Sequence, residues 1–506
     1  MAWNSFATPL IGKAVRKASR LAHGGGSAFP GKIVESIDPQ FLSRTLAQLP
    51  LGVVLVSGTN GKTTTTRMVA SMLGSLGLKV FTNPTGSNFT RGVVSALLSE
   101  VTLGGKLDAD IAVLELDEAY AVHFVRQVKP DYCLLLNVMR DQLDRFGEID
   151  NTARLLSKAA AATTGTVVLN REDPRIARLA DVVNTQDGVE VRYFGLDESL
   201  RRFFPPHDEK KNTVAEEADE LSADAESTAS STTECGESTE NATHRNPPST
   251  VDKPAQEADA LPADVTLLAV GDHHASFGID GESYATDVKL EGVYNLYNAA
   301  AALAVVRAVV ADAQAMFLPF EQSLSDADAA ALLRQAGVSQ RMIDFAHSGT
   351  QAMIDAAAEV TPAFGRGEVI DVDGSPVELL LVKNPMGFRL SLASFAPEGC
   401  DTMICINDEY ADGRDMSWLW DVDFTSLRGT GVAMVSGVRA WDMALRLEYD
   451  QVPVETVDTE LETSVERFVK TNPGKPKHIY CTYTAMLKAR AALGTIAHVA
   501  DAGVGR

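Results

Sequence analysis

The segment LGVVLVSGTNGKTTTTRMV, residues 51–69, joins an apolar run to a helical pattern through a glycine-rich turn. The run at 51–58 is short and ends in glycine, as is typical of a strand buried in a parallel sheet. Over residues 62–76 the apolar positions recur at helical spacing. Because glycines let backbone N–H groups curl around phosphates at a helix N-terminus, this strand–turn–helix unit predicts a nucleotide-phosphate site.

The turn supplies a compact set of candidate nucleotide contacts. We expect Lys62 to reach the β- and γ-phosphates and the Thr63 hydroxyl to ligate Mg²⁺. The general P-loop pattern has glycine at position 56, where this chain has Val56, and this departure points away from GTPases and generic ATPases. A glycine turn with only a structural role is the alternative. The candidate contacts are Gly58, Thr59, Asn60, Gly61, Lys62, Thr63 and Thr64.

The pattern of the first two hundred residues is that of strands alternating with helices. Apolar runs at 111–116, 131–138, 166–170 and 191–195 leave room for helices such as 151–163. We predict an α/β fold with a central parallel-sheet ATPase domain. Four further strand-like runs after residue 340 predict a smaller Rossmann-like α/β domain. The expected parts are an N-terminal helical segment (1–45), an ATP-binding central domain (46–340) and a C-terminal α/β domain (341–506).

Composition indicates a soluble globular chain with one atypical insert. The chain is 45% hydrophobic and 22% charged, with a formal net charge of −23. Residues 208–264 hold fifteen Asp or Glu and four Lys or Arg, and residues 205–276 contain no aromatic residue. We therefore expect a disordered acidic insert over 205–264 inside the central domain. Since binders of nucleic-acid phosphates are expected to be basic, the charge argues against a nucleic-acid partner.

The cysteines and the N-terminus bear on the compartment. The five cysteines are odd in number and include no CxxC pair, which favours a reducing cytosol and gives no disulfide framework. The N-terminus lacks a signal-peptide pattern. It predicts a short basic amphipathic helix that carries Lys13, Arg16, Lys17 and Arg20. This helix either packs, solvated, on the first domain or contacts a membrane surface.

Acidic and amide residues follow two of the predicted elements. Glu115 ends the run at 111–116, so its carboxylate is expected at the crevice edge of the sheet, where it would hold Mg²⁺ together with Thr63. Asp117 and Glu118 follow directly, either in the site or as a solvated acidic loop. Asn295 and Asn298 are three residues apart and would share a helical face, where two amides could read an adenine edge. The alternative for Asn295 is helix capping.

Taken in order, the motifs GTNGKTT, LELDE, NVMRDQLDRFG, NREDP, GVYNLYNAAAA and QRM resemble the Mur ligase superfamily. Residues 83–92, 383–388, 407–421, 436–449 and 480–487 resemble one branch, the MurT subunits of lipid II isoglutaminyl synthase. The resemblance covers nearly the whole chain apart from the acidic insert. It implies a ligase that joins nitrogen to a carboxylate through an acyl phosphate, with Lys62 and Glu115 in catalytic positions and Arg341, in the QRM motif, at the nucleotide.

The resemblance also implies a substrate, a partner and a place of action. MurT-like ligases amidate the α-carboxyl of D-glutamate in the stem peptide of lipid II with ammonia from a glutaminase subunit of the GatD type. The ligase subunit supplies a carboxylate that completes the glutaminase Cys–His pair, and here Asp412 and Asp415 are the candidates; capping of their own loop is the alternative. A cytoplasmic protein acting at the inner face of the membrane is expected.

Two departures from the family pattern bear on metals. Gln142 stands where Mur ligases usually have a histidine that helps to hold a second metal, which puts the second Mg²⁺ site in doubt. Family members often carry a four-cysteine zinc ribbon where this chain has only Cys235, so we predict no structural zinc. A folylpolyglutamate-synthase-like amino-acid ligase and a non-catalytic nucleotide-binding scaffold are the competing functions.

Overall fold

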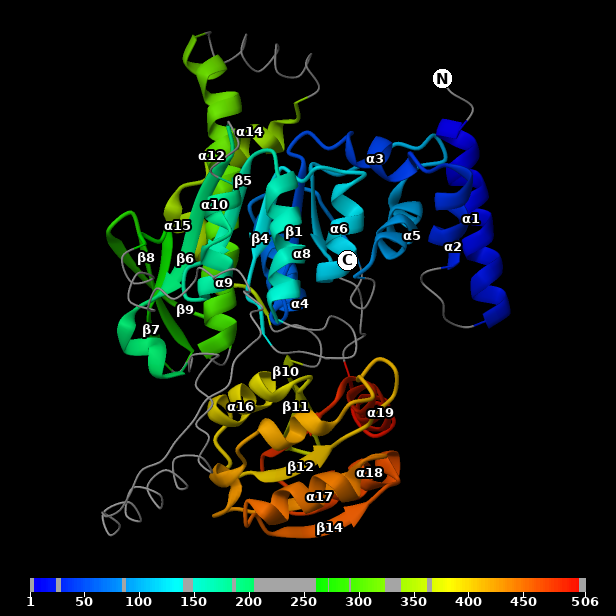
Figure 1. The fold of residues 1–506 in the computed structure, drawn as a ribbon, viewed down its shortest axis with the longest axis vertical. Helices are drawn as coiled ribbons and strands as arrows, with labels where there is room; N and C mark the ends of the chain where they lie inside the picture. Colours follow the sequence, from blue (N-terminus) through cyan, green and yellow to red (C-terminus); the bar gives the residue numbers. More distant parts are fainter. Residues whose placement is uncertain are drawn as a thin grey trace, which may run out of the picture.

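The computed structural model describes residues 4–23, 29–83, 88–139, 149–183, 188–203, 261–271, 273–290, 293–323, 338–361 and 366–499. Within these ranges the chain forms two α/β domains, the larger drawn above the smaller in Figure 1. Each domain is built around one sheet with helices on both faces. The α/β fold expected from the strand–helix alternation is therefore confirmed.

The large sheet has nine strands in the order β2-β3-β1-β4-β5-β6-β7-β8-β9. Neighbouring strands from β2 to β7 are parallel, and β7, β8 and β9 form antiparallel pairs at one end. The strands are β1 (Val53–Ser57), β2 (Val80–Thr82), β3 (Ile111–Glu115), β4 (Tyr132–Leu135), β5 (Thr166–Asn170), β6 (Glu190–Leu196), β7 (Val265–Gly271), β8 (His274–Ile279) and β9 (Glu282–Asp287).

Helices cover both faces of this sheet because its central strands are apolar on both sides. Along β1, Val53 and Leu55 face one core while Val54 and Val56 face the other. The first core is shared with α2 (Phe29–Ile37), α3 (Phe41–Leu46), α5 (Thr90–Glu100), α6 (Glu118–Val125), α8 (Ile149–Ala162), α9 (Pro174–Ala177) and α10 (Ala180–Val183). The second is shared with α4 (Lys62–Ser75), α12 (Val293–Ser323), α14 (Gln340–Ala346) and α15 (Thr350–Ala358). A short 3₁₀ turn, η1 (Glu198–Phe203), follows β6, and α1 (Asn4–His23) lies outermost on α2 and α5.

Helix α12 is apolar enough over Val293–Pro319 to cross a membrane by length and composition alone. In the fold it lies across the large sheet, where it packs against α4, α14, β6 and β7. Residues Ala299–Val306 are almost fully buried there. The helix therefore serves as a core element of the large domain.

The small domain has a six-stranded sheet in the order β10-β11-β15-β12-β13-β14, parallel except for the β10–β11 pair. Its strands are β10 (Arg366–Val372), β11 (Ser375–Leu381), β12 (Asp401–Cys405), β13 (Val432–Ser436), β14 (Val454–Asp458) and β15 (Lys477–Cys481). One face is covered by α18 (Leu461–Lys470) and α19 (Tyr483–Leu493). The other is covered by α16 (Pro385–Ser394), α17 (Ala440–Tyr449) and the 3₁₀ turns η4 (Ser417–Asp421) and η5 (Thr425–Leu427).

The two boundaries that we expected from the sequence differ from those of the structure. Helices α14 and α15 contribute Met342, Phe345 and Ile354 to the core of the large domain, so the small domain begins after residue 361 rather than at 341. At the end of the predicted insert, Asp264 is held by β6, where its carboxylate accepts a hydrogen bond from the Tyr193 N–H at 2.9 Å. The body of the insert, including Cys235, lies outside the described residues.

Candidate active site

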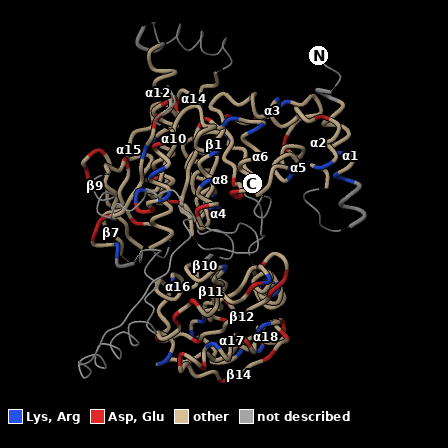
Figure 2. Tube along the Cα trace, in the orientation of Figure 1, with Lys and Arg blue, Asp and Glu red and all other residues tan. Residues whose placement is uncertain are grey.

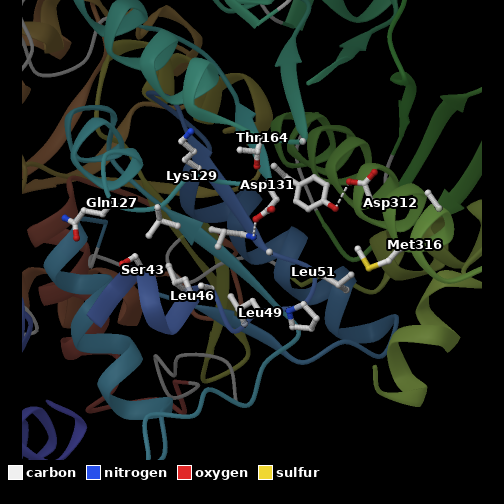
Figure 3. Close-up of a pocket in the computed structure, with 18 residues that line it drawn as sticks. Ser43, Leu46, Leu49, Leu51, Gln127, Lys129, Asp131, Thr164, Asp312 and Met316 are labelled. Atoms are coloured by element: carbon white, nitrogen blue, oxygen red, sulfur yellow. Dashed lines mark hydrogen bonds between the residues drawn. The ribbon is translucent and has the colours of Figure 1, made fainter. Parts of the chain in front are cut away.

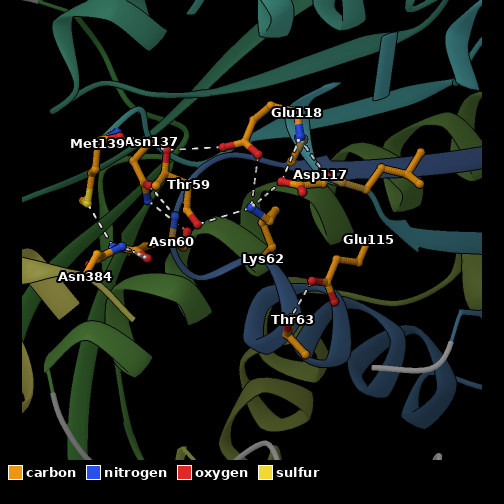
Figure 4. Close-up of polar contacts among 12 residues, drawn as sticks. Thr59, Asn60, Lys62, Thr63, Glu115, Asp117, Glu118, Asn137, Met139 and Asn384 are labelled. Atoms are coloured by element: carbon orange, nitrogen blue, oxygen red, sulfur yellow. Dashed lines mark hydrogen bonds and ion pairs between the residues drawn. The ribbon is translucent and has the colours of Figure 1, made fainter. Parts of the chain in front are cut away.

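The glycine-rich turn lies at the carboxyl edge of the large sheet, between β1 and α4. Gly58 and Gly61 have φ angles of 132° and 85°, which residues with a side chain rarely adopt. Asn137, just beyond β4, fixes the turn from the side: its carbonyl accepts from the Thr59 N–H at 2.9 Å, and its side chain exchanges hydrogen bonds of 2.8 and 3.0 Å with the Asn60 backbone (Figure 4). The turn is therefore held in shape before any phosphate arrives.

Lys62 is buried beneath the turn between two carboxylates. Its Nζ lies 3.5 Å from Asp117 Oδ1 and 3.4 Å from Glu118 Oε2, and it also donates to the Thr59 carbonyl at 3.3 Å. Burial raises the pKa of Glu118 to about 8, although the nearby Lys62 cation acts to lower it. Asp117 and Glu118 therefore belong to the site, and the reading of them as a solvated acidic loop is wrong.

Thr63 and Glu115 lie side by side at the start of α4 and the end of β3. The Thr63 hydroxyl donates to Glu115 Oε1 at 2.9 Å (Figure 4). Asn83 holds the backbone of Glu115 with two hydrogen bonds of 2.9 Å. Since Mg²⁺ takes oxygen ligands at about 2.0–2.1 Å in an octahedron, adjacent ligands lie roughly 2.9 Å apart. The two oxygens are therefore spaced as neighbouring Mg²⁺ ligands.

This arrangement fits a magnesium ion that is completed by substrate and water. Mg²⁺ in phosphoryl-transfer sites usually takes only one or two protein ligands beside phosphate oxygens. In agreement, the described residues contain no group of three His, Cys, Asp or Glu side chains that could hold a metal by themselves. Gln142, on which the second Mg²⁺ site depends, lies outside the described residues.

The small domain touches the phosphate turn directly. Asn384 Nδ2 donates to Asn60 Oδ1 at 3.0 Å, and Asn60 Nδ2 donates back to Asn384 Oδ1 at 3.3 Å (Figure 4). The same Asn384 oxygen caps α16 by accepting from the Gly387 N–H at 2.8 Å. The reciprocal amide pair therefore places the N-terminus of α16 next to the turn.

The start of α12 also borders the turn. A Cβ atom built on Gly61 would lie 2.7 Å from Asn298 Oδ1, so Asn298 packs against the turn itself. Asn295 lies inside the first turn of α12, two residues after the helix begins at Val293, and so it is not the residue that precedes and caps the helix. Recognition of adenine by these two amides stays a prediction.

Arg341, which we expected at the nucleotide, lies elsewhere. Its guanidinium forms a two-point ion pair with Asp110, with distances of 2.6 and 2.8 Å. Asp110 immediately precedes β3, whereas Glu115 and the phosphate turn follow the strands. At about 3.3 Å per residue, the strand separates the two ends by roughly 16 Å. Arg341 therefore anchors α14 at the amino edge of the sheet, and its assignment to the nucleotide site was wrong.

A cavity of about 840 Å³ opens at this same amino edge, lined in part by α3, β1 and α12 (Figure 3). Inside it the Asp131 carboxylate accepts from the Val53 N–H at 2.8 Å, and the Tyr132 hydroxyl donates to Asp312 at 2.7 Å. Burial raises the pKa of Asp131. The cavity lies across the sheet from the phosphate turn and is separate from the nucleotide site.

The two candidate aspartates of the small domain differ in their surroundings. Asp412 is buried, and it accepts hydrogen bonds from the Thr484 N–H at 2.7 Å, from the Thr484 hydroxyl and from the Glu409 N–H at 3.1 Å. Burial raises its pKa. Asp415 is exposed, and its Oδ1 accepts from the Ser417 N–H at 2.9 Å. Asp412 therefore ties the loop to α19, and only Asp415 presents its carboxylate at the surface.

Exposed apolar side chains also occur on the small domain. Trp441, Leu445 and Tyr449 repeat every fourth residue on the outer face of α17 and are 67%, 48% and 69% exposed. We call these three residues the α17 stripe. Tyr410, 88% exposed, lies in the same loop as Asp415. Large aromatic side chains at such exposure are typical of protein–protein contacts.

Some residues of the site were not among those predicted from the sequence. Asn137 and Asn83 hold the turn and Glu115, and Asn384 joins the turn from the other domain. All three occur in motifs that carried the family resemblance, so a signal was present. The partner of each, however, is between 32 and 324 residues away along the chain.

Two sequence families match this chain. The Mur ligase middle domain matches residues 56–233, and the MurT ligase C-terminal domain matches residues 381–486. The chain is 28% identical over 483 residues to the lipid II isoglutaminyl synthase (glutamine-hydrolyzing) subunit MurT of Streptococcus pneumoniae, with 93% of each chain covered. It is 28% identical over 454 residues to the MurT subunit of Staphylococcus aureus strain COL, with 88% of each covered. Over most of its length the chain is similar to MurT subunits. The name of these relatives describes one subunit of a glutamine-hydrolysing synthase.

Solved structures agree with the fold. MurF from Acinetobacter baumannii superposes with a TM-score of 0.57 at 15% identity, covering 90% of this chain and 78% of that chain. MurF from Thermotoga maritima, solved in complex with ADP, gives a TM-score of 0.55 at 15% identity, with 91% and 84% covered. At such identities the likeness concerns the fold alone, and it confirms the Mur-ligase-like architecture that the motifs indicated.

Proposed function

We propose that this chain is the ATP-dependent subunit of a lipid II amidating enzyme. It activates the α-carboxyl of D-glutamate in the stem peptide as an acyl phosphate and converts it to D-isoglutamine. The observation that carries this proposal is the joint position of Lys62 and the Thr63–Glu115 pair at the carboxyl edge of the large sheet, with the small domain in contact through Asn384. The names of the similar MurT subunits support the substrate class.

A carboxylate needs activation because oxide is too poor a leaving group. In the first step a carboxylate oxygen attacks the γ-phosphorus of ATP, the bond to the β-phosphate oxygen breaks, and ADP leaves. In the second step ammonia attacks the carbonyl carbon, the carbon–oxygen bond to phosphate breaks, and the nitrogen loses a proton to solvent. The products are the primary amide and inorganic phosphate.

The chain's own residues serve these steps mainly through charge and position. When phosphate enters, the Lys62 cation is already beneath the turn, held by Asp117 and Glu118, and can neutralise charge that builds on the transferred group. Helix α4 begins at Lys62, directly after Gly61, so the turn also lies at a helix N-terminus, which favours an anion. Thr63 and Glu115 would hold a Mg²⁺ ion, which when bound would supply positive charge to the phosphates.

We further propose that a GatD-type glutaminase supplies the ammonia and docks on the small domain. Asp415 would orient the catalytic histidine of that partner, and the α17 stripe with Tyr410 would form the adjoining contact. The exposure of the Asp415 carboxylate and of these aromatic side chains supports this placement. Because lipid II is the proposed substrate, the protein would act in the cytoplasm at the inner face of the membrane.

The proposal is tested by amidation of lipid II with the purified complex, and by the Thr63→Val variant. Valine keeps the shape of threonine and removes the hydroxyl, so amidation should fall by at least about a hundredfold while folding is unchanged. Ser71→Ala, an exposed change on the same helix, is the matched control and should keep full activity. Wild-type activity in Thr63→Val would refute the metal assignment.

The same assay separates the competing functions. A folylpolyglutamate-synthase-like ligase would consume ATP with a free amino acid as the acceptor and would not depend on a glutaminase. A nucleotide-binding scaffold would bind ATP without turnover under any of these conditions. ATP consumption that requires both lipid II and a nitrogen source supports the proposal, and either other pattern overturns it.

A further inference from the structure

Helix α1 carries a charge pattern unlike that of the rest of the chain. The protein has a net charge of −23, yet Asn4–His23 contains Lys13, Arg16, Lys17 and Arg20 and no acidic residue. Figure 2 shows basic positions on this helix at the outer edge of the molecule. A strongly cationic helix on an acidic protein would be favoured next to an anionic surface.

The helix packs on the large domain by one face only. Thr8 is buried, and its hydroxyl donates to Asp38 at 2.8 Å. Gly12 lies so close to α5 that a Cβ there would approach the Leu98 side chain to 2.4 Å. Lys13 Nζ reaches the Ser99 carbonyl at 3.4 Å. These contacts fix the orientation of α1 and so decide which face points outward.

The outward face combines apolar and basic side chains. Leu10 and Ile11 are 55% and 41% exposed, and Ala14 and Lys17 are exposed as well. Positions 10, 14 and 17 follow one another at helical spacing, on the side opposite Thr8 and Gly12. On the neighbouring α2, Phe29 is also 55% exposed. Apolar residues flanked by lysines on one helix face are typical of helices that lie in a membrane interface.

The position of α1 links this face to the active site. Helix α2, on which α1 packs, meets the start of α5, where a Cβ on Gly31 would lie 2.1 Å from the Arg91 carbonyl. Just before α5, the Asn88 carbonyl accepts a hydrogen bond of 3.0 Å from the N–H of Asp117, which is a residue of the active site. Helices α2 and α5 therefore connect α1 to the carboxyl edge of the sheet. Any surface that binds α1 would lie at a fixed distance from the active site.

We propose that the outward face of α1 lies on an anionic lipid surface, with Leu10 and Ile11 among the headgroups and Lys17 against lipid phosphates. Its role, to bring the ligase site to a membrane-embedded substrate, rests on the proposed function; the binding itself does not. Charge complementarity selects this occupant, because an anionic lipid surface offers phosphates to the cationic side chains of α1 and an apolar layer to Leu10 and Ile11.

The test is co-sedimentation of the full chain with vesicles that contain no lipid II. Phosphatidylcholine vesicles with added phosphatidylglycerol should bind the protein at low salt, and both high salt and pure phosphatidylcholine should release it. Leu10→Glu combined with Lys17→Glu changes the charge by three units and should lower the partition coefficient about a hundredfold, since each unit of charge near an anionic surface contributes roughly fivefold.

The matched control is Val182→Glu combined with Lys158→Glu, which makes the same charge change at two exposed positions of α10 and α8. This control should bind within about twofold of the wild type, because charge far from the surface is screened. No binding by the wild type, or an equal loss in the control, overturns the proposal. Association of copies through α1, seen by sedimentation velocity without vesicle binding, overturns it as well.

A second measurement separates this inference from the proposed function. Amidation of lipid II in vesicles should fall in the Leu10→Glu, Lys17→Glu variant, while amidation of a water-soluble short-chain analogue should be unchanged. Vesicle binding by a chain that amidates neither substrate leaves the α1 surface standing and refutes only the function. Equal loss on both substrates overturns the membrane role of α1.

Discussion

Asp412 and Asp415 lie three residues apart in one loop, and the structure predicts opposite consequences for the same Asp→Asn change. In Asp412, Oδ1 accepts from the Thr484 N–H, and Oδ2 accepts from the Thr484 hydroxyl and the Glu409 N–H. An asparagine offers one oxygen, so its NH₂ group must face at least one of these part-buried donors. An unsatisfied buried donor costs about 1–3 kcal/mol, and loss of a charged acceptor adds to this.

We therefore expect Asp412→Asn to lower the stability of the small domain by about 2–4 kcal/mol. For a unit of this size, that corresponds to a fall in melting temperature on the order of 10 °C. Asp415→Asn should leave stability unchanged within about 0.5 kcal/mol, because the Ser417 N–H can bond to the amide oxygen and the site is exposed. Thermal unfolding followed by circular dichroism measures both.

Activity should divide in the opposite way. Removal of a carboxylate that orients a catalytic histidine can cost about 10⁴-fold in rate, so Asp415→Asn should abolish glutamine-dependent amidation. Amidation with added ammonium salt should persist, because the phosphate turn is unaffected. Asp373→Asn, an exposed change in the β10–β11 turn of the same domain, is the control and should keep both activities.

Two results would refute this reasoning. Full glutamine-dependent activity in Asp415→Asn would show that the partner's histidine is not oriented from this position. Failure with both nitrogen sources in a folded Asp415→Asn protein would place the loop in the ligase site itself. Loss of the two activities in parallel with the folded fraction is the pattern expected of Asp412→Asn alone.

Three further predictions concern the large domain. Lys62→Ala should abolish ATP-dependent amidation. It should also cost about 3–5 kcal/mol of stability, because it leaves Asp117 and Glu118 buried without their cation, unless one of these carboxylates takes up a proton. Unfolding at pH 6 and pH 9 measures this cost. In the nucleotide-free wild type, the pKa of Glu118 is raised from its ordinary value of 4.5 to about 8, so the folded state holds an extra proton between these two pH values. The stability that this proton contributes is fully present below pH 4.5 and falls by up to about 1.4 kcal/mol per pH unit as the pH rises to about 8. Glu118→Gln should therefore flatten the pH dependence of the melting temperature, and an unchanged profile would contradict the raised pKa of Glu118. Deletion of residues 208–258 should change the free energy of unfolding by less than about 1 kcal/mol. Asp264→Ala removes the acceptor of the Tyr193 N–H and should cost about 1–2 kcal/mol. Equal losses of stability in the two denaturation curves would show that the deleted segment packs on the domain.

The elements around the phosphate turn could be predicted because their signals are local. The strand at 53–57, the turn and the helix from Lys62 are neighbours along the chain, and their apolar spacing states which faces are buried. Short or half-exposed strands gave weaker signals: β2 has three residues, and β14 is nowhere fully buried, so neither was expected. The spacing of apolar residues in α14 and α15 indicates that each helix has one buried face. It does not indicate whether that face packs in the core of the large or of the small domain.

The errors in the site have a common physical origin. Arg341 was assigned from its motif, and a motif does not state at which end of a sheet its side chain lies; the ion pair with Asp110 does. In the same way Asp412 and Asp415 are identical in type, and only the burial of Asp412 and its hydrogen bonds from Thr484 and Glu409 distinguish them. The contact between Asn60 and Asn384 spans 324 positions and depends on how two domains meet.

That contact has a thermodynamic consequence for the catalytic cycle. Each amide of the Asn60–Asn384 pair is both donor and acceptor, so both bonds exist at one relative placement of the domains and are lost together on rotation. If the domains separated, the turn would lose both bonds, so its free energy would differ between this closed arrangement and an open one. Because such coupling is reciprocal, whatever factor closure adds to nucleotide affinity, nucleotide must add to closure. Departure of ADP and separation of the domains would then be two descriptions of a single equilibrium.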